Sequence, residues 1–266
     1  DLCINQRIKR EDIAQLIGPF QTRNETRLWQ TEFWGKWILS AIAAYEYNHD
    51  QELLKMIQNA VSGLLSTQTP DGYIGNYSSE AQLQQWDIWG RKYSLLGLLA
   101  YFDISGDQKA LDAAKELADH LLTQVGPGKT DIVKTGNYRG MPSSSILEPM
   151  VLMYRHTGEK RYLDFAKYIV AQWETTDGPR LISKAIAGVS VAERFPKPPS
   201  WWSWENGQKA YEMMSCYEGL LELYRITGAP DYLKSAELSV QNIIETEINV
   251  AGSGNAFECF YNGGQR

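Results

Sequence analysis

Aromatic side chains and carboxylates stand close together at several places in this sequence of 266 residues. The chain holds 9 Trp and 15 Tyr. A flat ring can stack on the C–H face of a sugar, while a Trp N–H or Tyr O–H bonds its hydroxyl groups. Large helical proteins also pack Trp side chains between helices, so a ring indicates a ligand site only where it stands beside carboxylates. Their clustering predicts a cleft that binds carbohydrate.

The first cluster lies between residues 68 and 92. Pro-Asp-Gly at positions 70–72 predicts a tight turn, because Pro fixes φ and Gly supplies a positive φ. Stacking faces and charged partners for hydroxyl groups follow this turn. We therefore expect sugar contacts from Asp71, Tyr73, Trp86, Asp87, Trp89 and Lys92. The structural alternative is that Asp87 caps a helix and that the two tryptophans are hydrophobic wedges.

Two other places are candidates for contact with a ligand. Three indole rings fall within residues 201–204 of an irregular loop, and they cannot all turn inward. We therefore expect Trp202 and Trp204 to contact a sugar. Glu148 precedes Pro149 at the start of an apolar helix, where it either faces the cleft or interacts with the helix dipole.

Glu258 is the predicted catalytic acid. Glycosidases commonly use two carboxyl side chains, one of which gives its proton to the leaving-group oxygen. Glu258 follows a glycine-rich segment and lies between Phe257 and Phe260. Apolar surroundings disfavour the ionised carboxylate, as an acid requires. The alternative is a surface glutamate on a disordered terminus.

Composition argues against several classes of protein. The net charge of −6 argues against nucleic acid, which requires a basic face, and no apolar run of about 18 residues predicts a membrane span. The cysteines and histidines indicate neither a disulfide framework nor a metal site; they are Cys3, Cys216, Cys259, His49, His120 and His156. No signal peptide is visible, so the compartment stays open. The chain begins without Met, which slightly favours a periplasmic or secreted location over a cytoplasmic one.

A repeated helical hairpin must position these residues. Four segments share one plan: an apolar helix, a short polar turn and an amphipathic helix. The turns begin at His49, Gly106, Gly158 and Gly228, so they are 57, 52 and 70 residues apart. The apolar helices are predicted over residues 33–47, 93–104, 146–154 and 211–226. Two-helix repeats of this size indicate a solenoid or a closed toroid.

Apolar inner helices paired with amphipathic outer helices favour an all-α toroid of the (α/α)6 type. Four hairpins are evident of the six that such a ring contains, so we expect one domain over residues 1–266 with an incomplete ring. Either more sequence follows in the parent protein, or the missing wall is built in another way. Long loops are predicted over residues 67–91, 125–145 and 176–209 on one side of the ring, and loops of this length are usually functional.

Several motifs occur in a characteristic order. They are Trp34-Gly35-Lys36, then Gln68 with Asp71-Gly72-Tyr73-Ile74-Gly75, then Trp86-Asp87-Ile88-Trp89 with Lys92-Tyr93, and the Thr-Gly-x-x-x-Tyr-Leu hairpins. From about Trp29 to the end, the chain resembles the N-terminal portion of the β-L-arabinofuranosidase family of glycoside hydrolases. The resemblance implies an (α/α)6 toroid followed by β-rich domains, and removal of terminal L-arabinofuranose with retention of configuration.

The resemblance also implies a Cys nucleophile held on zinc by a Glu and further Cys, with a separate Glu as acid/base. The Glu-Thr-Cys motif of that centre is absent from residues 1–266, and Cys216 and Cys259 do not match it. We therefore expect no cofactor in this chain, and zinc only where the downstream ligands are present. Glu258 is the nearest match to the acid/base Glu, with Asn255 as the alternative position.

Two lysines mark a departure from the family. Its members place sugar-binding His at the starts of inner helices, where this chain has Lys92 and Lys209. The resemblance thus implies that both lysines contact the sugar and that the substrate differs.

Three functions remain open. The chain belongs to a glycosidase acting on plant-type arabinofuranosides, or it is a carbohydrate-binding toroid without catalysis. The third possible function is that of an unsaturated-uronyl hydrolase-like enzyme that relies on Asp71 and Asp87. Fold alone does not choose among them. In each case the partner is an oligosaccharide, and neither nucleic acid nor a membrane is expected.

Overall fold

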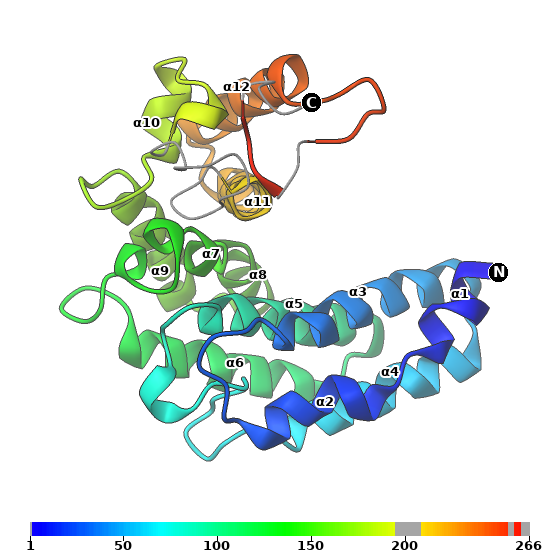
Figure 1. The fold of residues 1–266 in the computed structure, drawn as a ribbon. Coiled ribbons are helices and arrows are strands. Elements are labelled where there is room, and N and C mark those ends of the chain that lie inside the picture. Colours follow the sequence, from blue (N-terminus) through cyan, green and yellow to red (C-terminus); the bar gives the residue numbers. More distant parts are fainter. Residues whose placement is uncertain (1, 195–208, 255–257, 262–266) are drawn as a thin grey trace. The chain divides into compact units, whose positions relative to one another are not determined.

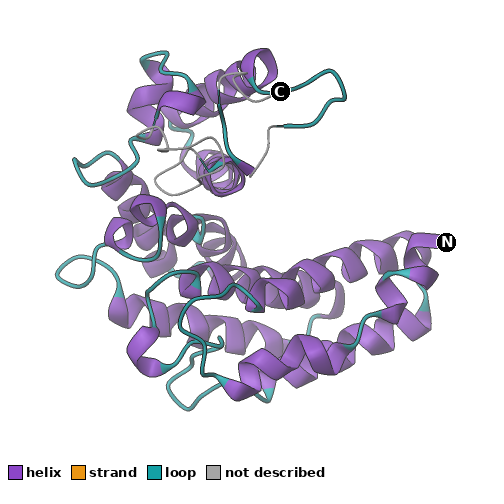
Figure 2. Cartoon of the chain, in the orientation of Figure 1, coloured by secondary structure: helices purple, strands orange, loops and turns teal. Residues whose placement is uncertain are grey.

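The computed structural model describes residues 2–194, 209–254 and 258–261. These residues form helices joined by loops, as Figure 2 shows, and among them the only β pairing is two isolated bridges. The all-α prediction is confirmed. The chain divides into two compact units, residues 1–125 and residues 126–266. No helix in the described part is long and apolar enough to cross a membrane.

The first unit contains two hairpins and a short N-terminal segment (Figure 1). The segment consists of α1 (Leu2–Gln6), the 3-10 turn η1 (Ile8–Arg10) and α2 (Ile13–Thr22). The hairpins are α3 (Thr31–Asn48) with α4 (Gln51–Leu65), and α5 (Asp87–Ser105) with α6 (Gln108–Gln124). The loop between them holds the 3-10 turn η2 (Ser79–Ala81). Helix α2 packs against α3 and α4, and α3 packs along α5.

The second unit contains the other two hairpins. They are α8 (Leu147–Thr157) with α9 (Lys160–Trp173), and α11 (Ala210–Thr227) with α12 (Pro230–Thr246). The segment before α8 holds η3 (Ile132–Lys134), η4 (Tyr138–Gly140) and α7 (Met141–Ser144). The segment after α9 holds α10 (Leu181–Ile186) and η5 (Val191–Glu193). Helix α8 packs against α11, and α10 packs against α12.

All four predicted turns are present. Each inner helix ends at a residue with left-handed φ, and these residues are His49, Gly106, Gly158 and Gly228. Their amides donate to the carbonyl four residues earlier, at 2.7–2.8 Å, and so close the helix. Asp50 then caps α4 by accepting from two amides, and Pro230 opens α12 at its first turn.

The amphipathic pattern predicts the buried faces of the outer helices correctly. In α6 the predicted stripe is Leu111, Ala114, Leu117, Ala118 and Leu121, and all five side chains are buried. In α4 the buried residues recur with the same helical spacing.

The inner helices α3 and α5 approach each other closely at glycines. A Cβ placed on Gly35 of α3 would lie 2.5 Å from the Cβ of Tyr93, and one placed on Gly97 of α5 would lie 2.5 Å from Ile38 Cγ2. Neither position has room for a larger residue. The two segments that carry the family-like motifs, residues 29–36 and 86–93, therefore lie side by side.

One predicted boundary is wrong. The inner helix expected over residues 93–104 begins at Asp87, six residues earlier. The charged residues Asp87, Arg91 and Lys92 made this stretch resemble a loop, but all three are buried inside the helical packing. The loop after α4 therefore covers residues 66–86.

Candidate functional site

The loop over residues 66–86 is fastened to α6 by its first turn. The amide of Gly72 donates to Thr69 O at 2.9 Å, and Gly72 has a φ of 93° as the Pro-Asp-Gly pattern predicts. A Cβ on Gly72 would lie 2.6 Å from the carbonyl oxygen of Glu116 in α6. Glycine thus provides both the turn and the close approach to the helix.

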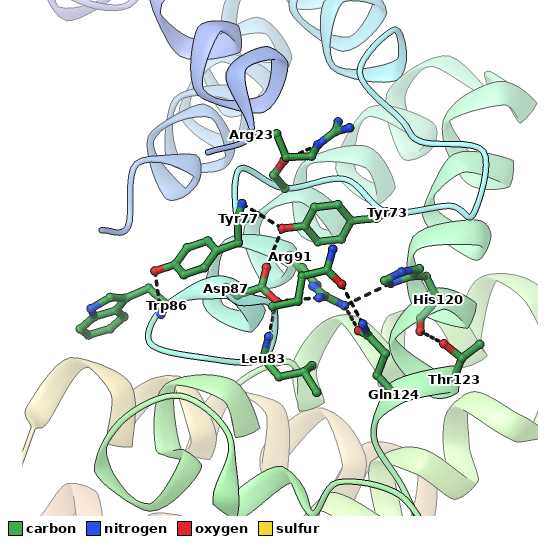
Figure 3. A network of polar contacts seen from close by, with 12 residues as sticks. Arg23, Tyr73, Tyr77, Leu83, Trp86, Asp87, Arg91, His120, Thr123 and Gln124 are labelled. Carbon is green, nitrogen blue, oxygen red and sulfur yellow. Dashed lines mark hydrogen bonds and ion pairs between the residues drawn. The ribbon is translucent and has the colours of Figure 1, made fainter. Parts of the chain in front are cut away.

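Asp87 is the centre of a buried polar network, which Figure 3 shows. Its Oδ1 accepts from the Tyr73 hydroxyl at 2.7 Å, and its Oδ2 accepts from Leu83 N at 2.8 Å and from Arg91 Nη2 at 2.6 Å. The side chains of Asp87 and Arg91 are fully buried. Asp87 is the first residue of α5 and follows the N-cap Trp86, so the alternative that it caps the helix is wrong.

Tyr73 joins the loop to this network. Its side chain is buried, its hydroxyl accepts from Tyr77 N at 3.1 Å, and the Arg91 guanidinium lies 4.6 Å from its ring centre. Burial, with the charge of Asp87, raises the pKa of Tyr73 well above its usual value, so the phenol stays a donor. Tyr73 and Asp87 were predicted to contact sugar, but in this structure both bind protein groups and neither presents an oxygen to the surface.

The network continues from Arg91 to the outer helix. Arg91 Nη1 lies 2.8 Å from Gln124 Oε1 and 3.3 Å from His120 Nδ1. On its other side, His120 Nε2 lies 3.3 Å from Asp71 Oδ2. Asp71 is two-thirds exposed, and a bond from the Thr69 hydroxyl lowers the pKa of its carboxyl. Asp71 thus keeps one face open to solvent.

An aromatic row lies beside this network; we define it as Trp29, Trp86, Trp89 and Tyr93. Successive ring centres are 5.9, 6.0 and 5.3 Å apart in edge-to-face geometry. The row runs from buried rings at Tyr93 and Trp89 to Trp29, which is 44% exposed. It therefore offers ring surface to a ligand at one end while its other end is fixed in the core.

Charged groups accompany the buried end of the row. Glu32, near the start of α3, accepts from the indole N–H of Trp89 and from Lys36 Nζ, the latter at 2.8 Å. Lys92 Nζ lies 5.0 Å from the ring centre of Trp89 and 5.3 Å from that of Tyr93. The structure thus brings the predicted residues Trp86, Trp89 and Lys92 together.

A second group of charged residues lies in the second unit, at the start of α11. Lys209 precedes this helix, and its Nζ lies 2.8 Å from Glu258 Oε2 and 3.8 Å from Glu212 Oε1. Lys209 also forms an isolated antiparallel bridge with Cys259. Burial alone would lower the pKa of Lys209, but the carboxylates of Glu212 and Glu258 outweigh it and the pKa is raised. The ammonium therefore stays charged.

Glu258 does not have the apolar surroundings expected of it. Its carboxyl is 67% exposed and paired with the Lys209 ammonium, and Phe257 lies outside the described residues. The backbone of Glu258 has a φ of 54°, a left-handed conformation that few residues other than glycine adopt.

Known proteins match this chain in sequence and in fold. Residues 5–185 match the family described as β-L-arabinofuranosidase, GH127 catalytic domain. The chain belongs to this family. A non-reducing end β-L-arabinofuranosidase of Bifidobacterium longum subsp. longum is 26% identical over 148 residues, which are 51% of this chain and 22% of the relative.

Solved structures show the same helical toroid fold for this GH127 chain. A GH127 β-L-arabinofuranosidase from Geobacillus stearothermophilus T6 matches 98% of the chain and 44% of its own length, with a TM-score of 0.69 and 20% identity. A GH76 α-mannanase of Bacteroides thetaiotaomicron matches 87% of the chain and 62% of its own length, with a TM-score of 0.57 and 16% identity. The chain thus spans less than half the length of the GH127 proteins it matches.

The remaining predicted residues of the GH127 chain have less defined surroundings. Glu148 lies in the first turn of α8, partly exposed. Trp202 and Trp204 lie outside the described residues. Glu212 and Glu218 lie on different faces of α11, since Glu212 is buried while Glu218 is exposed.

The described residues of the GH127 chain do not fit a zinc centre. No group of three or more His, Cys, Asp or Glu side chains in this part of the chain could hold a metal ion. Cys216 is buried, with Sγ 3.2 Å from Met141 O. Burial raises the pKa of the Cys259 thiol, whereas a zinc ligand is a thiolate. Zinc with downstream ligands stays a prediction.

Proposed function

We propose that this chain forms part of the catalytic toroid of a glycoside hydrolase that removes terminal β-L-arabinofuranose from plant-type oligosaccharides with retention. Membership of the GH127 family is the observation that carries the proposal. The B. longum relative is a non-reducing end β-L-arabinofuranosidase, and a chain with sugar-stacking rings beside charged groups suits that chemistry.

The aromatic row supports a sugar subsite in the first unit. Trp29 and half-buried Trp86 offer ring faces, and Trp86 packs on buried Trp89, which bonds Glu32. A ring held in place loses little conformational freedom when a sugar stacks on it. Lys36, whose side chain is partly exposed, supplies a cation that can bond hydroxyl groups at the same place, and Glu32 holds that cation.

The family resemblance and the accessibility of its carboxyl support an acid/base role for Glu258 in the second unit. An acid/base glutamate of a retaining enzyme first gives a proton to the leaving oxygen and then takes one from the attacking water. The Lys209 ammonium, 2.8 Å from Glu258 Oε2, can hold the carboxyl in place for these steps. Two-thirds exposure leaves the carboxyl accessible to substrate.

The test of this role is Glu258→Gln in the intact enzyme. Glutamine keeps the shape of the side chain but cannot transfer the proton, so turnover of an aryl arabinofuranoside with a poor leaving group should fall ~100-fold or more. The matched control is Glu218→Gln, an exposed position of α11, which should leave turnover unchanged. Near-normal turnover by the Glu258 variant would reject the role.

The geometry gives less support to an unsaturated-uronyl hydrolase-like mechanism. That reading needs a carboxyl such as that of Asp87 to act on substrate. Both oxygens of Asp87 are occupied by Tyr73, Leu83 and Arg91, and the side chain is fully buried.

A further inference from the structure

His120 of α6 connects three parts of the first unit and has no role in the proposed chemistry. It is 8% exposed. Its ring touches Arg91 of α5 and Asp71 of the 66–86 loop, each at 3.3 Å. The Tyr73 ring centre lies 5.5 Å away. His120 is thus one of the contacts through which the loop, α5 and α6 meet, and Figure 3 shows its contact with Arg91.

The contacts of His120 fix which ring nitrogen carries the proton. A guanidinium can only donate, so Nδ1 must accept from Arg91 Nη1. The proton of the neutral ring is then on Nε2, which faces Asp71 Oδ2. A second proton on Nδ1 would set two N–H groups against each other and place an imidazolium beside the guanidinium. The observed arrangement therefore accommodates only the neutral ring.

We propose that His120 is a positioning residue, which holds the 66–86 loop and the middle of the aromatic row, Trp86 and Trp89, in their sugar-binding arrangement only while its ring is neutral. Sugar binding is then weakened by acid. The part of this inference that concerns sugar rests on the proposed function, whereas the part that concerns the loop does not.

The path from His120 to the aromatic row is continuous. Asp71 and Tyr73 lie two residues apart in the turn that packs on α6, and Tyr73 bonds Asp87 at the start of α5. Tyr77, which bonds Tyr73 through its amide, accepts from Trp86 N at 3.2 Å. Release of the turn from His120 would therefore loosen the groups that place Trp86.

The charges around His120 determine the direction of the pH effect. Asp71 and Tyr73 of the loop and Asp87 and Arg91 of α5 face the ring. Burial first, and then Arg91, lower the pKa of His120 below its usual 6.5, outweighing Asp71 and Asp87. We call the form in which the 66–86 loop contacts His120 the closed form, and the form in which the loop has left His120 the open form. The open form, like the unfolded chain, therefore binds this proton at higher pH than the closed form. The closed form is fully favoured above pH 6.5 and loses stability as the pH falls below that value.

The experiment measures hydrogen–deuterium exchange of the wild-type chain between pH 5 and 8, corrected for intrinsic exchange rates. Protection of residues 66–86 should fall about tenfold or more toward pH 5, while protection of α9, in the other unit, should hold. His120→Gln removes the titration, because an amide can accept from Arg91 and donate to Asp71, and it should make the loop's protection independent of pH. Unchanged protection of the wild-type loop at pH 5 would overturn the proposal.

A second variant and a binding measurement test the proposal further. Asp71→Asn, at an exposed position, removes a charge that favours the imidazolium in the closed form and so lowers the closed-form pKa of His120 further. The loss of loop protection toward pH 5 should therefore be larger than in the wild type, and an equal or smaller loss would contradict the proposal. Calorimetry with methyl β-L-arabinofuranoside should show affinity falling with the loop's protection in the wild type and not in His120→Gln. Absence of binding at pH 7.5 would reject the sugar site while leaving the loop result intact.

Discussion

At the residue scale, the sequence predicts which side chains of one helix lie close together. It does not predict which side chains of other helices they contact. Trp86, Trp89 and Lys92 meet because they lie within two turns of one helix. Glu32 meets Trp89 across 57 residues, and that contact exists only because α3 packs on α5. No local pattern indicates it.

His120 shows the same limit. A lone His on an amphipathic outer helix indicates nothing by itself. The available signal was Arg91, a charge within an apolar helix that must be buried and therefore requires partners.

The exposed end of the aromatic row leads to a prediction for Trp29. Trp29→Ala removes the most exposed ring of the row, and loss of one stacking contact of 0.5–1.5 kcal/mol corresponds to about two- to tenfold weaker sugar binding. Isothermal calorimetry with an arabinofuranoside measures this. Tyr47→Ala, which removes a more exposed ring at the other end of α3, is the control and should bind normally. Equal affinity for all three proteins would remove the row from the subsite.

At the element scale, the four hairpins were predictable because helical periodicity, the turns and the caps all agree. The short helices within the long segments were not. Helices α7 and α10 have four and six residues, too few for a periodic pattern. Helix α2 was missed although it has ten residues, because it belongs to none of the four repeats and Pro19 interrupts its pattern.

The crossing of α3 and α5 leads to a prediction at this scale. Gly35→Ala would place a methyl group 2.5 Å from the Cβ of Tyr93 and 2.6 Å from its carbonyl oxygen, and such overpacking costs about 1–3 kcal/mol. Gly18→Ala in α2 meets nothing within 4 Å and should stabilise by roughly 0.5–1 kcal/mol, because alanine favours helix over glycine. Urea unfolding of both variants measures the difference. Similar midpoints for the two would refute the tight crossing.

At the scale of the whole molecule, apolar surface concentrates on one helix of the second unit. Val240 and Ile244 of α12 are 52% and 59% exposed, and Leu238 and Ile248 are also exposed. Val240 and Ile244 are about one helical turn apart, so they form a stripe on one face of α12; Ile248 follows the end of the helix at Thr246. Repetition of an amphipathic hairpin predicts which face of an outer helix is apolar, but not whether that face is covered.

The stripe leads to a prediction about solubility. The double substitution Val240→Lys with Ile244→Glu should change the free energy of unfolding by less than about 0.5 kcal/mol, because neither side chain is buried. It should also lower the fluorescence of a dye that binds apolar surface. The control Ile169→Lys, at a fully buried position of α9, should unfold the unit. A large loss of stability in the double variant would show that the stripe is covered.

The glycine contacts between α3 and α5 also constrain how this protein can diverge. A Cβ on Gly35 would meet the Cβ and the backbone carbonyl of Tyr93. A Cβ on Gly97 would instead meet the side chains of Ile38 and Trp34. Among homologues, position 35 should therefore stay glycine, because a smaller side chain at position 93 leaves the backbone in place, whereas position 97 should covary with positions 34 and 38. New sugar preferences would then arise by exchange of side chains on a fixed pair of helices, since the helices themselves cannot move apart by small steps.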